Sequence, residues 1–395
     1  MPTVSVPSSS LCSPLLVNLS VLMNRPTGIS TYAQNLLPFL RSFNPVLLSA
    51  NSISGFRIRK VPEDMSPAYG SKGHLKRLCW LQREVPAYCR QLSAHQLSAR
   101  QLSAQLSTQT SGQALGAAAQ SLLFSPLPEA PLYTGCRFVV TVHDTIPLRF
   151  PQAFPLPLVS YFRYYVRRVL QQAAHIICNS SATAEAIKRF YQISAHKITP
   201  IALAYDQQNF CPLKMPTENY FLYIGRHDRH KNVSRLISAF AQVYQANHCL
   251  ELRLVGPIDQ RYTPALRAQV ASLGLAKCVH FLDYVDYREL PVLLGGAIAL
   301  TFPSLWEGFG LPVLEAMACG TPVIASNLAS LPEVTGDAAL LINPYDVDAL
   351  ADAMRQVAID ASVGEQLRRA GLTRSRHFSW QKTGQQTAQL LKQFM

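Results

Sequence analysis

Short apolar runs that are typical of buried strands alternate with helical patterns along most of this 395-residue chain. In the first half the strand-like runs occupy residues 14–20, 122–125, 138–143 and 175–179, and a helical pattern follows residue 30. A second series begins near Tyr220. This alternation is typical of parallel α/β units, so two series predict two doubly wound parallel-sheet domains.

The boundary between the two domains is predicted in residues 205–218, which contain two prolines and show no periodicity. We therefore expect one domain over 1–206 and another over 207–377. The composition agrees with folded domains, because 48% of the residues are hydrophobic and only 15% are charged.

Targeting and redox features favour a cytoplasmic protein. No apolar run reaches the roughly 18 to 20 residues of a membrane span, and no basic residue precedes the weak apolar stretch at the start. The nine cysteines are odd in number and never spaced as C-x-x-C, which favours reduced thiols over a disulfide framework or a zinc site.

The basic charge lies almost entirely in the first half. Residues 1–206 hold 19 Lys and Arg against 7 Asp and Glu, whereas 207–395 hold 17 against 16. This asymmetry favours an anionic surface or an acidic substrate over nucleic acid as the partner. The densest cluster, within residues 56–90, is compatible with a basic amphipathic helix on an anionic membrane and equally with an ordinary solvated face.

A short tandem repeat, RQLSA-HQLSA-RQLSA-QLST, occupies the start of residues 90–120. A five-residue period advances about 140° net per repeat on a helix, so its leucines circle the axis and form no apolar stripe. We interpret 90–120 as a low-complexity surface insertion, helical or disordered, without a catalytic role.

Two glutamates flank a glycine-rich turn after a predicted strand. Pro312 begins a helix and Gly320 follows its end. Gly308 and Gly310 let the backbone approach a ligand, and the free amides at the helix start favour an anion or a polar oxygen. Glu307 in the loop and Glu315 on the helix are predicted to bind two parts of one ligand. The alternative is that they form a glycosidase-like acid/base pair of carboxylates.

A second loop between strand and helix, 225–232, brings Arg226 and Lys231 beside free backbone amides, as a phosphate site requires. An exposed basic loop is the alternative, and we expect His227 and His230 at the surface. In the first half, Gly28 lies at a strand-to-helix turn, from which it can approach the same ligand across a cleft or serve as a turn residue only.

These motifs resemble those of glycosyltransferase family 4, retaining enzymes that use nucleotide sugars and have the GT-B fold, two Rossmann-like domains facing a cleft. The resemblance rests on Glu307-GFGLPVL-Glu315 with the following AMACGTPVIA, and it lapses over residues 44–120. Further matching stretches are PTGIS at 26–30, TVHDTIPLRFP at 141–151, FLYIGR at 221–226 with Lys231-Asn232, and LPEVTGD at 331–337.

The resemblance implies a role for each matching position. Arg226 and Lys231 would neutralise the donor diphosphate, Glu315 would bind the ribose, and Glu307 would bind the donor sugar. The remaining implied site residues are the amides around Gly308, Phe309, Gly310 and Leu311, Gly28 beside the diphosphate, and His143 beside the transferred sugar. The family's retention of configuration is explained without a protein nucleophile, and its last helix, here within 378–395, packs back on the first domain.

We therefore expect a hexosyltransferase, mannosyl or glucosyl, that moves the sugar of a GDP- or UDP-sugar to a glycan or lipid-linked acceptor in cell-surface polysaccharide biosynthesis. The stretch 143–151 resembles that of bacterial mannosyltransferase-like members of the family, and this resemblance favours GDP-mannose. No cofactor and no metal is expected, because Asp346-Val-Asp348 precedes a helical run and is interpreted as a helix cap. The protein would be cytoplasmic, with membrane contact at the inner face through 56–90. The alternatives are a GT-B nucleotide-sugar epimerase and a non-enzymatic basic protein that binds membranes or polyanions.

Overall fold

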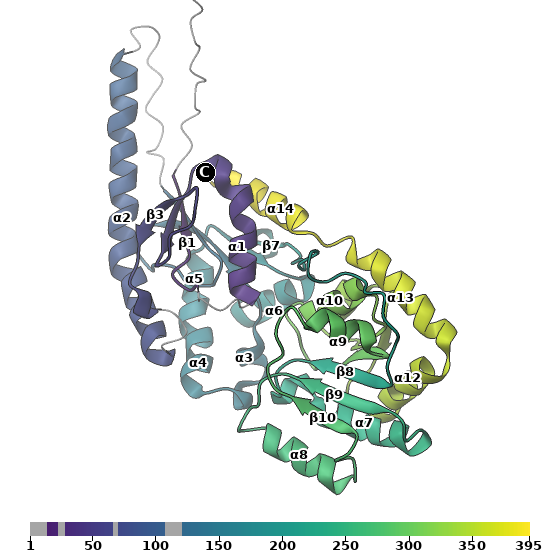
Figure 1. Ribbon diagram of the computed structural model, residues 1–395. Coiled ribbons are helices and arrows are strands. Elements are labelled where there is room, and N and C mark those ends of the chain that lie inside the picture. Colours follow the sequence, from purple (N-terminus) through teal and green to yellow (C-terminus); the bar gives the residue numbers. More distant parts are fainter. Residues whose placement is uncertain (1–13, 23–27, 66–69, 107–120) are drawn as a thin grey trace, which may run out of the picture.

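Two parallel sheets, each covered by helices, make up the molecule (Figure 1). The computed structural model describes residues 14–22, 28–65, 70–106 and 121–395. This architecture confirms the predicted pair of doubly wound α/β domains.

The first sheet has, among the described residues, seven strands in the order β3-β2-β1-β4-β5-β6-β7. Its core strands are buried along their whole length, as the continuous apolar runs predict for a sheet covered on both faces. The strands are β1 (Leu15–Asn18), β2 (Val46–Ser49), β3 (Arg57–Lys60), β4 (Leu122–Ser125), β5 (Arg137–Val142), β6 (His175–Cys178) and β7 (Ile198–Pro200). The helices are α1 (Gly28–Leu40), α2 (Gly70–Leu106), α3 (Ile146–Arg149), the 3-10 turn η4 (Pro151–Ala153), α4 (Leu156–Ser160), the π-helix η5 (Tyr161–Val166), α5 (Arg167–Gln172) and α6 (Ser181–Tyr191).

The second sheet has six strands within 121–395, in the order β10-β9-β8-β11-β12-β13. Its strands are β8 (Tyr220–Ile224), β9 (Glu251–Val255), β10 (Val279–Leu282), β11 (Ala299–Phe302), β12 (Val323–Ser326) and β13 (Leu340–Ile342). Its helices are the 3-10 turn η7 (Arg229–Lys231), α7 (Val233–Ala246), α8 (Thr263–Ser272), α9 (Leu290–Gly296), α10 (Leu311–Cys319), α11 (Leu331–Thr335), α12 (Val347–Ile359) and α13 (Ala361–Ser375).

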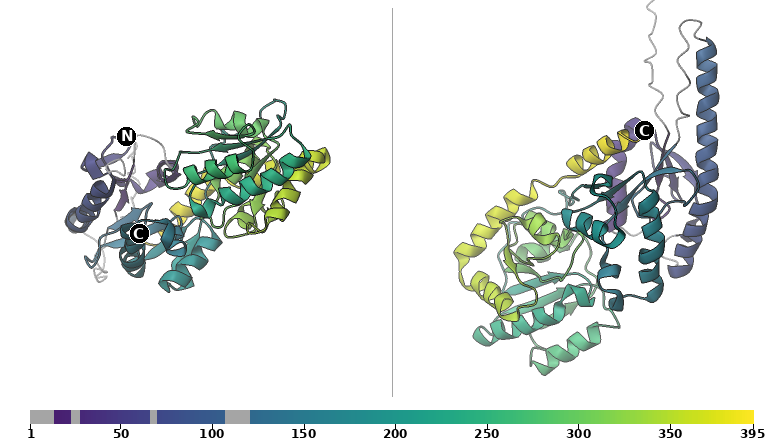
Figure 2. Two further views of the ribbon diagram at one scale, coloured as in Figure 1. Left: turned by 90° about the horizontal axis from the view of Figure 1, so that it is seen from below. Right: turned by 180° about the vertical axis from the view of Figure 1, so that it is seen from behind.

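The last helix, α14 (Trp380–Lys392), leaves the second domain and lies along α1 of the first (Figures 1 and 2). Gly384 makes the close approach possible, because a Cβ atom there would lie 2.0 Å from Cδ2 of Phe39. The Thr383 hydroxyl also donates to the Ala202 carbonyl over 2.7 Å. The chain therefore crosses between the domains twice, once through the irregular segment before β8 and once between α13 and α14.

The helix α2 agrees with the helical alternative for the repeat, whereas the interpretation of the basic cluster is corrected. It runs without interruption from Gly70 to Leu106, so the repeat from residue 90 extends an existing helix, and its remainder to residue 120 lies largely outside the described residues. The basic cluster 56–90 is not one amphipathic helix, because its first cations belong to the edge strand β3. Arg77 of the same cluster is buried against Glu129.

One further local prediction is confirmed. Asp346 caps α12 by accepting from the backbone N–H of Ala349 over 2.9 Å, so the D-x-D sequence has a structural role. Ser180 caps α6 by accepting from the Thr183 N–H over 3.0 Å. In the described part of the chain no helix is long and apolar enough to cross a membrane.

Candidate functional site

The strand order places a ligand crevice in each domain. In the second sheet the chain moves outward in one direction from β8 to β9 and then returns to add β11 on the other side of β8. Ligands of open α/β sheets bind beyond the carboxyl ends of the strands at such a reversal. The two loops at this point, 225–232 and 303–310, are those that carry Arg226, Lys231 and Glu307.

Lys231 and Glu307 form a shielded ion pair between these two loops. The Lys231 ammonium donates to Oε1 of Glu307 over 2.6 Å, and the two side chains are 16% and 9% exposed. The hydroxyl of Ser330 fixes the Glu307 loop by donating to the carbonyls of Glu307 and Phe309, over 3.1 and 2.9 Å. The sequence therefore brings a cation and a carboxylate together at the crevice, where each can contact a different group of one ligand.

Gly308 touches the first domain directly. A Cβ atom at this position would lie 2.1 Å from the carbonyl oxygen of His143, so only glycine permits this contact. The Gly308 carbonyl in turn accepts from the Ser180 hydroxyl at the start of α6, over 2.6 Å. Two residues on, Gly310 precedes α10 with φ of 103°, a conformation that favours glycine.

His143 follows β5 at the carboxyl edge of the first sheet. Its Nε2 lies 2.9 Å from the carbonyl oxygen of Pro126, so Nε2 carries the proton, because a carbonyl only accepts. Burial lowers the pKa of His143 to about 4, which keeps the ring neutral at physiological pH. Its edge-to-face contact with Tyr32, at 5.0 Å between ring centres, fixes the ring plane.

A cavity of about 770 Å³ lies between the domains and is lined by Gly28 and Asn35 of α1 and by Leu311 and Glu315 of α10. Burial and the nearby Asp206 raise the pKa of Glu315 to about 7. The cavity is therefore large enough for a small ligand, and its lining includes a carboxyl group that changes charge near neutral pH.

Arg226 lies outside this group. Its side chain is 62% exposed, and its Nε pairs with Oδ2 of Asp228 at 3.0 Å, with Asp259 at 3.9 Å. The expectation that His227 and His230 lie at the surface is wrong, since they are only 3% and 4% exposed. His230 is buried because Phe150 of the first domain stacks on it, with ring centres 5.8 Å apart.

The segment of α3 and η4 contacts the residues that immediately precede the ion pair. Phe150 stacks on His230, the neighbour of Lys231. The guanidinium of Arg149 lies 3.5 Å from the ring centre of Trp306, the neighbour of Glu307. The first domain thereby supports both loops of the ion pair through adjacent aromatic rings.

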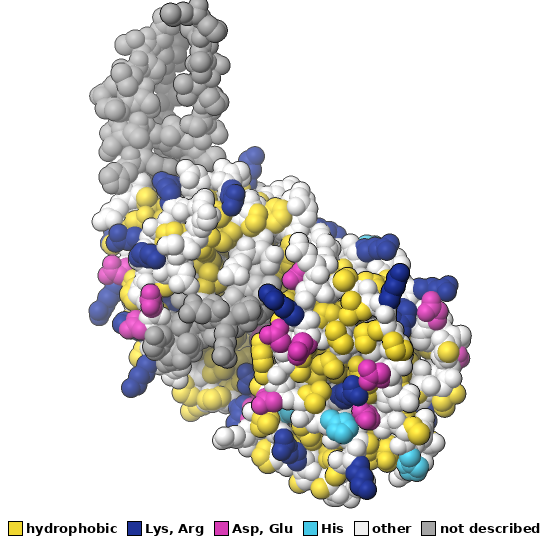
Figure 3. All heavy atoms as spheres, viewed as in Figure 1, with side chains coloured by type: hydrophobic (Ala, Val, Ile, Leu, Met, Phe, Trp, Pro, Cys, Tyr) yellow, Lys and Arg dark blue, Asp and Glu magenta, His cyan; other side chains and the backbone are white. Residues whose placement is uncertain are grey.

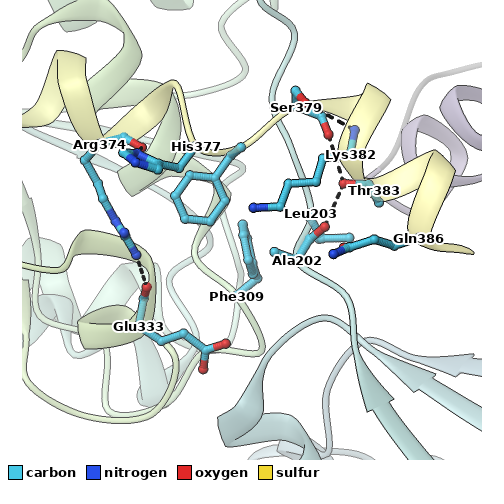
Figure 4. Close-up of a pocket in the computed structure, with 11 residues that line it drawn as sticks. Ala202, Leu203, Phe309, Glu333, Arg374, His377, Ser379, Lys382, Thr383 and Gln386 are labelled. Atoms are coloured by element: carbon cyan, nitrogen blue, oxygen red, sulfur yellow. Dashed lines mark hydrogen bonds between the residues drawn. The ribbon is translucent and has the colours of Figure 1, made fainter.

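Where the chain crosses back to the first domain, a second cavity of about 270 Å³ lies beneath the connection (Figure 4). Arg374 donates to the Glu333 carbonyl over 2.6 Å, and the Glu333 carboxylate accepts from the Ser181 N–H over 2.9 Å. Phe309 lines the same cavity, so the crossing segment lies directly behind the glycine-rich loop.

The structure thus separates the candidate residues into two adjoining groups. His143, Gly308 and the ion pair lie at the contact between the domains, whereas Gly28, Leu311 and Glu315 line the larger cavity. Sequence reasoning missed Asp206, Arg149 and Trp306. A signal for the last two was present, since Trp306 directly precedes Glu307 and Arg149 lies within the stretch that begins at His143.

Two family models match the chain. One, described as "Glycosyl transferases group 1", matches residues 206–374. The other, described as "Glycosyltransferase Family 4", matches residues 114–208.

Curated relatives include mannosyltransferases. The chain is 32% identical over 268 residues to "O-antigen chain mannosyltransferase B" of Escherichia coli. The matched region covers 65% of this chain and 70% of that protein. It is 34% identical over 242 residues to "MMP alpha-(1->4)-mannosyltransferase" of Mycolicibacterium hassiacum, covering 58% of this chain and 57% of that protein.

Solved structures share the fold over nearly the whole chain. Anabaena HepE, determined in complex with UDP and glucose, superposes with a TM-score of 0.67 at 18% identity, covering 96% of this chain and 100% of that one. Sucrose-phosphate synthase of Thermosynechococcus elongatus gives a TM-score of 0.66 at 20% identity, covering 96% and 98%.

Proposed function

We propose that this chain, which belongs to glycosyltransferase family 4 and is a glycosyltransferase, transfers a mannosyl residue from GDP-mannose to a glycan or lipid-linked acceptor. The transfer would retain the anomeric configuration and serve the synthesis of a cell-surface polysaccharide. The observation that carries this proposal is the Lys231–Glu307 pair at the sheet's reversal point, beside a cavity that Glu315 lines. The mannosyltransferases among the relatives favour mannose over glucose.

The donor would lie along these groups from its base to its sugar. Glu315 accepts hydrogen bonds from the ribose hydroxyls, and Lys231 faces the diphosphate, where its charge offsets the charge that grows as the glycosidic bond breaks. Glu307 accepts from hydroxyls of the sugar. Gly28 leaves space for the diphosphate on the side of the first domain, and His143 lies beside the transferred sugar.

The reaction needs no protein nucleophile in this scheme. The bond between the sugar's anomeric carbon and the diphosphate oxygen breaks, and the acceptor oxygen forms the new bond on the same face. The acceptor's proton passes to the leaving phosphate oxygen. We propose that the enzyme uses no cofactor and no metal, with Lys231 facing the leaving group and the exposed Arg226 as a second cation of the same loop.

A product assay with Lys231→Ala tests the proposal. A charge-assisted hydrogen bond contributes about 1.5 to 3 kcal/mol, so the variant should lose about 10- to 100-fold in kcat/KM for the donor. Lys277→Ala, an exposed lysine of the same domain, is the matched control. If the wild-type protein neither binds nor turns over GDP-mannose, UDP-glucose or another nucleoside diphosphate sugar, the proposed function is wrong.

The product assay and a binding assay together separate the two rivals. An epimerase releases an isomerised sugar without an acceptor, so product that forms equally with and without acceptor favours that alternative. A non-enzymatic binder of polyanions shows salt-sensitive binding that is indifferent to nucleotide sugar and to Glu315→Ala.

We also propose that the basic first domain contacts an anionic membrane surface through residues 56–90. Leu75 is 63% exposed, and it lies between the exposed Lys72 and Lys76 on α2. Flotation with vesicles of neutral lipid, and with vesicles that contain anionic lipid, measures the contact. Equal flotation with the two kinds of vesicle would contradict it.

A further inference from the structure

A third cavity lies in the first domain, between the edge strand β3 and the helix α2. It measures about 200 Å³ and is lined by Arg59 and Lys60 of β3 and by Trp80, Glu84 and Tyr88 of α2. The three α2 residues are spaced by four, so they lie along one face of the helix. None of the site residues described above belongs to this cavity.

The cavity opens at the edge of the sheet where the reaction would take place. Arg59 and Lys60 are the last two residues of β3, and Leu48, which also lines the cavity, pairs with Arg59 and with Asn18 at the end of β1. Because all strands of this sheet are parallel, their carboxyl ends share one edge, and His143 follows β5 at that edge.

The distance to His143 limits which part of an acceptor can reach the cavity. The order β3-β2-β1-β4-β5 separates the two positions by four strand spacings. At about 4.8 Å per spacing, this is roughly 19 Å. A group in the cavity is therefore too far away to be the accepting sugar, but it can be a more distant part of an extended acceptor.

The side chains favour a sugar ring over a phosphate. Trp80 and Tyr88 are half-buried rings on either side of the exposed carboxylate of Glu84, which repels an anion but accepts from a hydroxyl. The two cations are already engaged, since the Arg59 guanidinium lies 5.3 Å from the ring centre of Tyr88 and Lys60 donates to the Ala50 carbonyl over 2.9 Å.

The first domain also carries both signs of charge on this side. Figure 3 shows acidic as well as basic side chains on the side of the first domain that carries α2. A sugar offers hydroxyls that can donate to Glu84 and an apolar face that packs on an aromatic ring such as Trp80, so it matches the groups that are not already engaged.

We propose that this cavity is a remote acceptor subsite, which binds one sugar ring of a glycan several units away from the sugar that receives the transferred residue. The inference rests on the proposed function, because it assigns the acceptor's class to the same reaction. It predicts that the enzyme prefers long acceptors to short ones.

The test uses α-linked mannooligosaccharides of one to six units as acceptors, with Trp80→Ala and Glu84→Ala as the variants. Both variants should raise the KM for the longest acceptor about tenfold, leave its kcat and the donor KM unchanged, and leave the shortest acceptor unaffected. Arg83→Ala, an exposed α2 residue outside the cavity, is the matched control. Glu84 is exposed, so its variant stays informative if Trp80→Ala reduces stability.

Calorimetric titration with the six-unit mannooligosaccharide, which cannot react in the absence of donor, measures acceptor binding separately. Binding by the wild-type protein that weakens about tenfold in Glu84→Ala supports the subsite even where no transfer is detected. No binding, or equal binding by both proteins, overturns it. Tighter flotation of Glu84→Ala with anionic vesicles and an unchanged acceptor KM would overturn it in favour of a lipid-binding cavity.

Discussion

The contact of Gly308 with His143 allows a sharp prediction for Gly308→Ala. The new Cβ atom would lie 2.1 Å from the His143 carbonyl oxygen, whereas real Cβ contacts are essentially never shorter than 3.0 Å. The two loops must therefore separate by about an ångström. His143 and the Glu307 loop would then no longer hold one ligand in the geometry described above.

The expected cost follows from that displacement. A misplacement of about 1 Å near reacting groups can cost about 100-fold in rate, which corresponds to about 2.7 kcal/mol. Separately, the overpacked contact should lower the free energy of unfolding by roughly 1 to 3 kcal/mol. Because the clash lies between the domains, each domain keeps its own core, and the variant should lose kcat while nucleotide affinity changes little.

The assay is initial-rate kinetics with a nucleotide sugar and an acceptor, together with nucleotide titration and thermal unfolding. Gly364→Ala is the matched control, since a Cβ atom there meets nothing within 4 Å. A Gly308→Ala variant that retains kcat within twofold would refute the idea that catalysis needs this contact between the domains.

Three further outcomes are expected. Burial raises the pKa of Glu315 from 4.5 to about 7, so between these pH values the folded state keeps a proton that the unfolded state releases. The ionisation of this group therefore lowers the free energy of unfolding as the pH rises from about 4.5 to 7. In denaturant titrations, Glu315→Gln should remove that pH dependence. Arg149→Ala removes a cation–π contact of about 1 kcal/mol with Trp306 and should lower kcat/KM about fivefold. The double variant with Trp306→Ala should lose no more than that, and additive losses would contradict a functional coupling between Arg149 and Trp306. Gly384→Ala should destabilise the protein by about 1 to 3 kcal/mol, against the usual gain of an alanine in a helix, and an unchanged melting temperature would show that α1 and α14 part easily.

The alternation of strands and helices predicted the architecture because buried parallel strands leave continuous apolar runs, as in β12. The ends of α10 were also readable, since Gly310 and Gly320 both adopt conformations that favour glycine. Local sequence preferences were therefore sufficient for the alternating architecture and for the ends of α10, but not for the edge strand β3 within the basic cluster.

Contacts between the domains could not be predicted from the sequence, because they are made by residues that lie far apart along the chain. The burial of His230 depends on Phe150, and the chain offers no local pattern that links the two. The basic cluster misled for a similar reason: Arg77 looks solvated in the sequence, but Glu129, 52 residues later, pairs with it in the interior.

The return of α14 to α1 also affects how the chain is made. During synthesis the first domain emerges early, but the surface of α1 that receives α14 stays uncovered until Trp380–Lys392 have left the ribosome. The second domain, whose strands and helices form one continuous stretch, can complete its core before that. A protein stalled or truncated before Trp380 would thus present a finished second domain attached to an unfinished first one, with the Phe39 side of α1 open to aggregation or to chaperones.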